Sequence, residues 1–161
     1  MFENEIAILT FQLKHFEKVL ADLPAEKLYE PAPGHGHSIG WLLGHLALSS
    51  EYGIAMLGGK VEHPQWAPIF GAGSDGVASS TTGPDRETLV AAFRKNHAEL
   101  LERASNATAE HVHQPHSVKM FEGSSIKTIG NVVGMLMTNH FGFHLSQLSS
   151  CRRSCGHEKL F

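Results

Sequence analysis

Two histidines near the C-terminus stand one helical turn apart, at positions where an apolar pattern calls for leucine. Val133, Leu136 and Met137 mark a helical stripe, and His140 continues it four residues after Leu136. His144 follows one turn later on the same face. Residues at i and i+4 of a helix present two imidazole nitrogens to one point, and buried imidazoles need a polar partner. Taken alone, such a pair is more typical of two ordinary histidines bonded to neighbours or water, and a metal site is the alternative that a third nearby histidine would favour.

A third histidine, His45, lies in the apolar segment 41–46 of a second predicted helix. It follows Leu42 by three residues and Trp41 by four, so we expect it to face inward or onto a cleft. If the two helices are neighbours, three imidazoles meet. Three protein ligands leave coordination positions open, which is typical of a catalytic rather than a structural metal site.

Other polar residues are candidates for contacts near this site. Gln147, one turn beyond the C-terminal pair, would orient a ligand or a bound water, or it simply packs. Tyr52, seven residues after His45, would contact substrate or belong to the core. For His97, on the stripe of a third helix, a satisfied core histidine is preferred to a ligand. Loop histidines are usually solvated, and the sequence leaves open the role of His35, His37, His111, His113 and His116.

Four long helical patterns must position these side chains. Apolar residues recur at spacings of three and four over residues 4–22, 38–57, 84–104 and 128–155. Ser38 and Thr128 are candidate N-caps. The connections, rich in Gly, Pro, Ser and His, are long enough for crossovers. The sequence therefore predicts an all-α fold, a single four-helix bundle with long crossover loops, over residues 1–161.

The composition narrows the class of protein. Thirteen basic residues stand against sixteen acidic ones, for a net charge of −3, and no basic stripe is present, so a nucleic-acid partner is not expected. The longest mainly apolar run, residues 39–48, is about half of what a membrane span needs. The N-terminus is acidic where a signal peptide would be basic. Cys151 and Cys155 are spaced for packing on a helix rather than for a disulfide. We expect a cytoplasmic protein with no membrane partner.

Further motifs accompany the histidines: S-I-G-W-L-L-G-H-L at 38–46, H-x-x-x-H-x-x-Q at 140–147, Arg152-Arg153 ahead of Gly156, and W-x-x-x-F at 66–70. Together they resemble the DinB/YfiT-like superfamily, a group of metal-binding four-helix bundles, over nearly the whole chain. The resemblance implies one metal held by His45, His140 and His144. Family members carry zinc, nickel, manganese or iron, and characterised relatives include transferases or isomerases that use low-molecular-weight thiols, and iron enzymes of thiohistidine synthesis. Dimers are common in the family, so a homodimer is expected.

The chain departs from the family pattern at two places. Leu145-Ser146-Gln147 stands where many relatives read Arg-Gly-Gln, and His37 stands where many carry Trp. Neither change removes a ligand. Both alter the surroundings of the site, so the identity of the thiol stays open.

The leading functional hypothesis is a thiol-dependent S-transferase acting on a small molecule. A divalent metal, with zinc or nickel preferred and iron or manganese as further choices, would stabilise the thiolate of a low-molecular-weight cosubstrate. One alternative is a hydrolase that uses metal-bound water. For that reaction Glu51 is a poor base, because it follows His45 by six residues and lies on roughly the opposite side of the helix. The other alternative is a non-enzymatic stress protein that binds a metal or ligand.

Overall fold

The computed structural model describes residues 1–31, 34, 36–74 and 82–160, and these are helical or in loops, with no strand among them. The long helices are α1 (Glu3–Ala21), α2 (Ile39–Met56) and α4 (Arg86–Asn106). A last rod joins α6 (Ile129–Met135), the π-helical turn η4 (Leu136–His140) and α7 (Phe141–Ser154). The predicted all-α fold is confirmed, and the long helices end within two residues of the predicted bounds.

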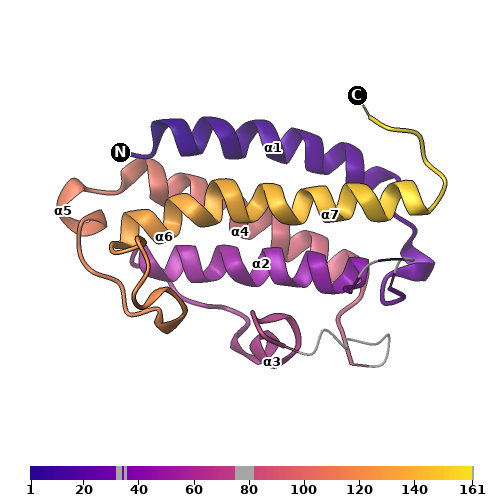
Figure 1. The fold of residues 1–161 in the computed structure, drawn as a ribbon, viewed down its shortest axis with the longest axis horizontal. Helices are drawn as coiled ribbons and strands as arrows, with labels where there is room; N and C mark the ends of the chain where they lie inside the picture. The colour runs from indigo at the N-terminus through magenta and orange to yellow at the C-terminus, as the bar shows by residue number, and fades with distance from the viewer. Residues whose placement is uncertain (32–33, 35, 75–81, 161) are drawn as a thin grey trace.

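The long helices lie side by side along the long axis of the molecule (Figure 1). α1 packs against α4 and the last rod, and α2 packs against the same two elements from the other side. Aromatic rings fill the space between them: Phe16 of α1 stacks on Phe93 of α4 with ring centroids 3.8 Å apart, and Phe141 of α7 lies beside both. All three side chains are fully buried, so the core runs through the middle of the bundle.

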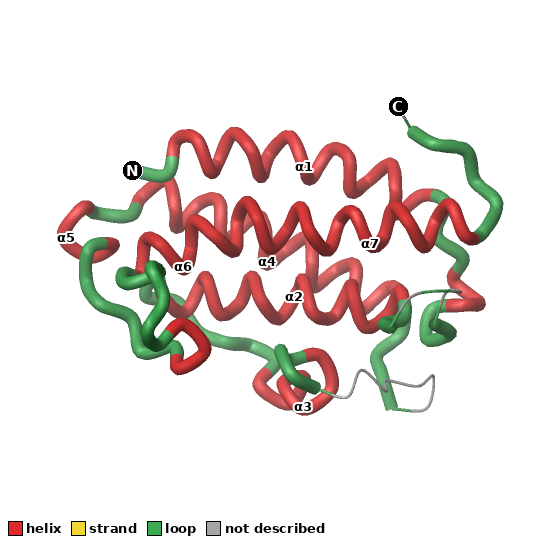
Figure 2. The backbone as a smooth tube through the Cα atoms, viewed as in Figure 1, coloured by secondary structure: helices red, strands yellow, loops and turns green. Residues whose placement is uncertain are grey.

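Short helices interrupt the three connections (Figure 2). The first connection holds η1 (Ala25–Lys27). The second, from α2 to α4, holds η2 (Pro64–Trp66) and α3 (Ala67–Phe70). The third, from α4 to α6, holds α5 (Ala109–Val112) and η3 (Lys119–Phe121). The second connection packs on α2, and fifteen of the eighteen residues of α2 are buried. α2 is therefore a central helix, enclosed on nearly all sides, rather than one with a wide solvent face.

Local side-chain chemistry fixes where the helices begin. Ser38 accepts a hydrogen bond from the backbone N–H of Trp41 at 3.1 Å and caps α2. Thr128 and Asn131 form a reciprocal capping box at the start of α6. Both caps are confirmed as predicted, because the cap residues and the first apolar positions after them are local features of the sequence.

The last rod is not the uninterrupted α-helix that its sequence pattern predicts. The π-helical turn η4 adds one residue to a turn, so the faces before and after it are out of step. The buried stripe runs through Val133, Met137, Phe141 and Leu148. His140 lies at the edge of this stripe and is half-buried, which corrects its predicted place within the stripe.

A buried carboxylate ties α2 to α4 and to the second connection. Glu51 is 1% exposed, and its Oε2 accepts hydrogen bonds from the backbone N–H groups of Glu62 and His63, both at 2.9 Å. Its Oε1 accepts from the Asn96 side chain at 2.9 Å and pairs with His63 Nδ1 at 2.5 Å. These four contacts satisfy the buried oxygens and fix the point at which the chain turns toward α3.

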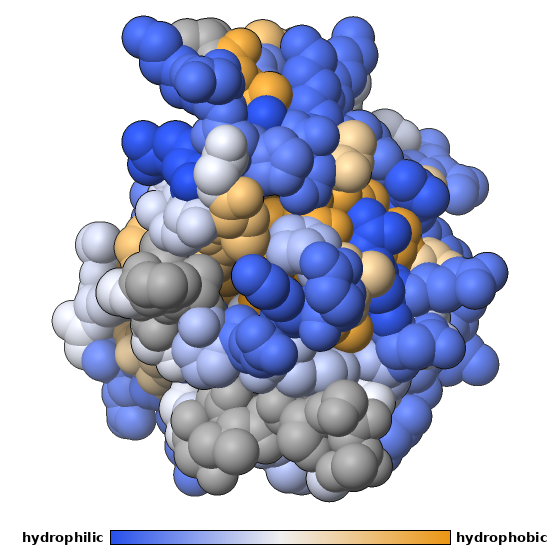
Figure 3. All heavy atoms as spheres, turned by 90° about the vertical axis from the view of Figure 1, so that its right-hand side faces the viewer, coloured by the Kyte–Doolittle hydropathy of each residue, from blue (hydrophilic) through white to orange (hydrophobic). Residues whose placement is uncertain are grey.

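The far end of the bundle is held by a second ion pair. Arg152, near the end of α7, is 6% exposed and pairs with Asp22 at the end of α1, with an N···O distance of 2.5 Å. Figure 3 shows this end face-on, and hydrophilic residues cover most of it, with apolar residues visible between them. No helix in the described part of the chain has the length and hydropathy needed to cross a membrane.

We predict that Glu51→Gln lowers the free energy of unfolding by about 2 kcal/mol, because the new amide N–H group would face buried donors and leave at least one of them unpaired. Glu17→Gln is the matched control, since Glu17 pairs with Arg94 on the surface and such pairs contribute at most about 1 kcal/mol. Urea unfolding curves measure both changes. Equal losses in the two variants would contradict the role assigned to Glu51.

Candidate metal centre

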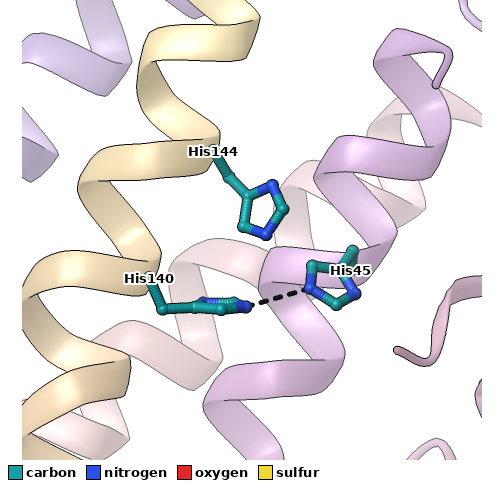
Figure 4. Close-up of side chains that lie close together, drawn as sticks. All are labelled: His45, His140 and His144. Carbon is teal, nitrogen blue, oxygen red and sulfur yellow. Dashed lines mark hydrogen bonds between the residues drawn. The ribbon is translucent and has the colours of Figure 1, made fainter. Parts of the chain in front are cut away.

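Three imidazole rings converge between α2 and the last rod, at the middle of the bundle (Figure 4). His45 comes from α2, His140 ends η4, and His144 lies in the first turn of α7. One ring nitrogen from each lies within 4.8 Å of the others, which is a group that could hold a metal ion. His45 Nε2 and His140 Nε2 are 3.0 Å apart. Two nitrogens on one tetrahedral ion, with bonds of about 2.0 Å, stand about 3.3 Å apart, so the spacing of His45 and His140 fits a single ion.

Hydrogen bonds on the outer side of the rings set which nitrogens carry lone pairs. His45 Nδ1 lies 2.6 Å from the backbone carbonyl of Phe70, which can only accept, so Nδ1 carries the proton and Nε2 the lone pair. His144 Nδ1 donates to Gln147 Oε1 at 2.7 Å, which leaves its Nε2 with a lone pair as well. His140 Nε2 then donates to His45 Nε2, and a metal ion would take the place of that proton. Such outer contacts orient metal-binding histidines before the ion arrives.

Trp41, one helical turn before His45 in α2, supports the rings of His45 and His144. Its indole stacks on His45 with centroids 4.6 Å apart and an interplanar angle of 9°, and it meets His144 edge-on at 6.2 Å. Its Nε1 donates to Ser74 Oγ at 3.0 Å, which holds the indole in place. The rings are thus fixed by stacking as well as by hydrogen bonds.

The carbonyl that orients His45 reaches it because Gly44 has no side chain. A Cβ at Gly44 would lie 2.6 Å from the ring of Phe70, so only glycine lets Phe70 rest directly against α2. Trp66 meets Phe70 edge-on at 5.7 Å and stacks on His63 at 4.1 Å. The W-x-x-x-F motif therefore supports the site through a backbone atom. Sequence analysis did not identify this contact, and its only visible signal was a glycine directly before His45.

Burial and mutual proximity keep the three imidazoles neutral. Desolvation first, and then the neighbouring His144 and His45, lower the pKa of His140 to about 3. Desolvation, with His45 next, lowers the pKa of His144 to about 4. Burial also lowers the pKa of His45, and the hydrogen bond to Phe70 partly opposes this. At pH 7 all three are neutral, which is the form that binds a metal ion.

The remaining candidate residues lie in three different settings. Gln147 contacts the site through His144, as described above. Tyr52 is 38% exposed and lines a cavity of about 790 Å³ that His45 and His140 also line. His97 is buried on α4, where Nδ1 donates to the Phe93 carbonyl at 2.8 Å, and it is not part of the three-histidine group. His97 is thus a buried histidine with one ring nitrogen bonded within its own helix, and its predicted place in the core stays a prediction.

The loop histidines that the structure describes are held by backbone contacts or by stacking, or are exposed. His111 Nε2 bonds to the Met56 carbonyl at 2.7 Å, and His113 is exposed. His116 bonds through both ring nitrogens to its own loop. His37 stacks on Trp41 with ring centroids 3.7 Å apart, and Trp41 in turn stacks on His45, so His37 is linked to the candidate metal centre through one intervening ring. His35 lies outside the described residues.

We predict that Gly44→Ala weakens metal binding by about tenfold to hundredfold, the range typical when an outer partner of a ligand is lost. The added methyl would push Phe70 and its carbonyl away from His45. Gly134→Ala is the matched control, because its Cβ would meet only Glu5 at an ordinary 3.6 Å. Competition with a chromogenic zinc chelator measures the affinity. Unchanged affinity in Gly44→Ala would show that the carbonyl contact is dispensable.

The metal-free protein should lose stability as the pH falls from about 6.5 toward about 4. Burial lowers the pKa values of His45, His97, His140 and His144, the last three to between about 3 and about 4. In that interval the unfolded chain binds more protons than the folded one, so the free energy of unfolding falls with acid. Urea midpoints at several pH values measure the slope. His97→Gln should reduce the dependence of the unfolding free energy on pH, and the exposed His113→Gln should not. Equal pH dependence in the two variants would argue against the buried histidines as its cause.

Comparison with known proteins identifies the family of the chain. The family model of the DinB superfamily matches residues 8–148, which includes the three histidines, Gln147 and the Trp66–Phe70 motif. No curated protein has a significant match to the chain. The match covers most of the sequence, and the chain belongs to the DinB superfamily.

Proposed function

We propose that the chain is a thiol-dependent S-transferase whose His45, His140 and His144 hold a divalent metal ion, zinc or nickel first and iron or manganese next. The observation that carries the proposal is the set of three neutral imidazoles directed at one point beside a cavity of about 790 Å³. A bound divalent cation lowers the pKa of a thiol, so that the thiolate is available at neutral pH.

The chain's own residues would hold the metal ion and orient the ligand nitrogens. His45 and His144 would enter the site with their tautomers already set by Phe70 and Gln147. The low pKa values keep the rings of His140 and His144 neutral near pH 7, so each ring has one nitrogen with a lone pair, and the histidines serve as ligands rather than as acids. In the transfer the thiol sulfur bonds to an electrophilic carbon, the leaving group departs with the electron pair of its bond, and the thiol proton goes to solvent.

The surroundings of the site favour a thiol over water as the nucleophile. Among the described residues, no aspartate or glutamate lines the cavity or joins the three histidines, and Glu51 is held by His63, Asn96 and two backbone groups. A thiol has an ordinary pKa of about 8.5 and bulk water of about 15.7, so a thiol needs far less help from a base.

We further propose that residues 1–161 act as one domain, as a cytoplasmic homodimer that takes a small molecule and no nucleic acid. The family resemblance and the exposure of Ile8 and Phe11 on α1 and of Phe143 on α7 support a second copy as partner. The free thiols of Cys151 and Cys155 support a reducing compartment. The net charge of −3 gives no attraction to nucleic acid.

The first test is metal content, measured by plasma mass spectrometry on untagged protein. We expect about one metal ion per chain, lost in His45→Ala, His140→Ala and His144→Ala and retained in His97→Ala and His113→Ala. Retention of metal in any of the first three would remove that residue from the ligand set. Absence of metal from the parent, even after reconstitution with zinc, nickel, manganese and iron, would end the enzyme hypothesis.

The second test separates transfer from hydrolysis and from simple binding. Cobalt-substituted protein should develop a thiolate-to-metal absorption band when a low-molecular-weight thiol is added, and mass spectrometry should detect an S-alkylated product once an electrophile follows. The His140→Ala variant should show neither. Cleavage of an ester without thiol would identify a hydrolase, and a band without product would identify a binding protein.

A further inference from the structure

The cavity beside the metal centre has apolar walls from four parts of the chain. It lies between α2, the α6–η4 part of the last rod and the third connection, and two residues of the segment after α3 complete it. Its apolar side chains include Leu48, Met56, Val118, Phe121, Val132 and Leu136. At about 790 Å³ it has the size of a site for a small organic molecule.

No charged side chain lines this cavity among the residues that the structure describes. His116 does line it, but His116 Nε2 donates to the Ile126 carbonyl at 3.0 Å and Nδ1 accepts from the Val118 N–H at 3.0 Å. Both nitrogens are used and the ring is neutral, so it offers no cation to a ligand. The other polar side-chain groups that line it outside the metal centre, among the described residues, are the hydroxyls of Ser49, Tyr52 and Ser117.

The cavity also reaches the proposed metal centre. His45 and His140 form part of its wall, whereas His144 does not and lies instead against Trp41 and Gln147. A molecule in the cavity would therefore approach the centre from the side of His45 and His140. Ser49 follows His45 by four residues and Tyr52 follows it by seven along α2, which brings their hydroxyls to the same wall.

From these observations we infer that the cavity binds an uncharged molecule with an extended apolar body, and that this molecule is the electrophile of the proposed transfer. The inference rests on the proposed function. Away from the metal centre, a carboxylate or ammonium group on the apolar body would lose its hydration and find no side chain of opposite charge, and this penalty disfavours charged analogues. Apolar walls provide most of the affinity, and the Ser49 and Tyr52 hydroxyls orient one polar end.

The test uses metal-free protein, so that a bound cation cannot attract an anion. Three ligands with the same ten-carbon chain compete with the uncharged dye Nile red: 1-decanol, decanoate and decyltrimethylammonium. At pH 7.5 we expect 1-decanol to displace the dye at a concentration at least about tenfold lower than either ion, a factor that a single unpaired charge easily supplies. Equal displacement by decanoate or by the ammonium ion would overturn the inference.

Variants locate the binding within the cavity. Ala55→Trp places an indole in the cavity wall and should weaken 1-decanol binding by about tenfold or more, with circular dichroism to verify the fold. Met120→Lys changes a wall residue that is 66% exposed, so folding is not at risk, and it should strengthen decanoate binding at least about threefold. Ser125→Lys is the matched control, because Ser125 is exposed in the same connection and outside the wall, and it should change nothing. A stronger decanoate response in Ser125→Lys, or none in Met120→Lys, would place the ligand elsewhere.

The two proposals fail separately. If the protein holds no metal but prefers 1-decanol, the proposed function falls and the selectivity of the cavity stands. If metal is present and lost in the three histidine variants, but decanoate binds as well as 1-decanol, the inference about the uncharged substrate falls alone.

Discussion

The hydrogen bond from His45 Nδ1 to the Phe70 carbonyl joins the helical bundle to the connection that covers it, and it orients one ring of the candidate metal centre. A carbonyl can only accept, so this contact fixes one tautomer and leaves Nε2 directed at the other histidines. The carbonyl is placed by a chain of contacts that begins at Glu51, which holds the backbone at Glu62 and His63. The chain ends where Phe70 rests on Gly44. The second connection, from α2 to α4, is therefore part of the site and not only a link between two helices.

The same apolar surroundings act on the site in two ways. They remove solvent from the imidazoles, which keeps them neutral and able to bind a cation, at a cost in stability when no cation is present. They also line the cavity with side chains that offer no opposite charge to a charged ligand. Metal binding and ligand selection would then share one cause, the absence of charge around His45 and His140 among the described residues.

The sequence was sufficient for the parts of the structure that local rules control. Helix periodicity and the caps at Ser38 and Thr128 are local, so the long helices and their ends were predicted closely. The stripe argument brought His140 and His144 together with His45, although it placed His140 too deep. Contacts between distant segments were not predictable in this way. The Phe70 carbonyl is a backbone atom with no signature of its own, and the packing of the third connection against α6 follows from tertiary contacts that periodicity does not encode.

The π-helical turn η4 has a consequence for how the last rod transmits change along its length. A residue added to one turn rotates everything after it by about 100° relative to an uninterrupted helix. α6 is anchored by its capping box and α7 by the pair between Arg152 and Asp22, so the two halves of the rod are secured at opposite ends of the bundle. The ring of His140 stands at the junction of these two registers. Loss of a single residue from η4 would rotate α7 as a rigid body. His144 would then move away from His45, and Arg152 would move away from Asp22, in the same step.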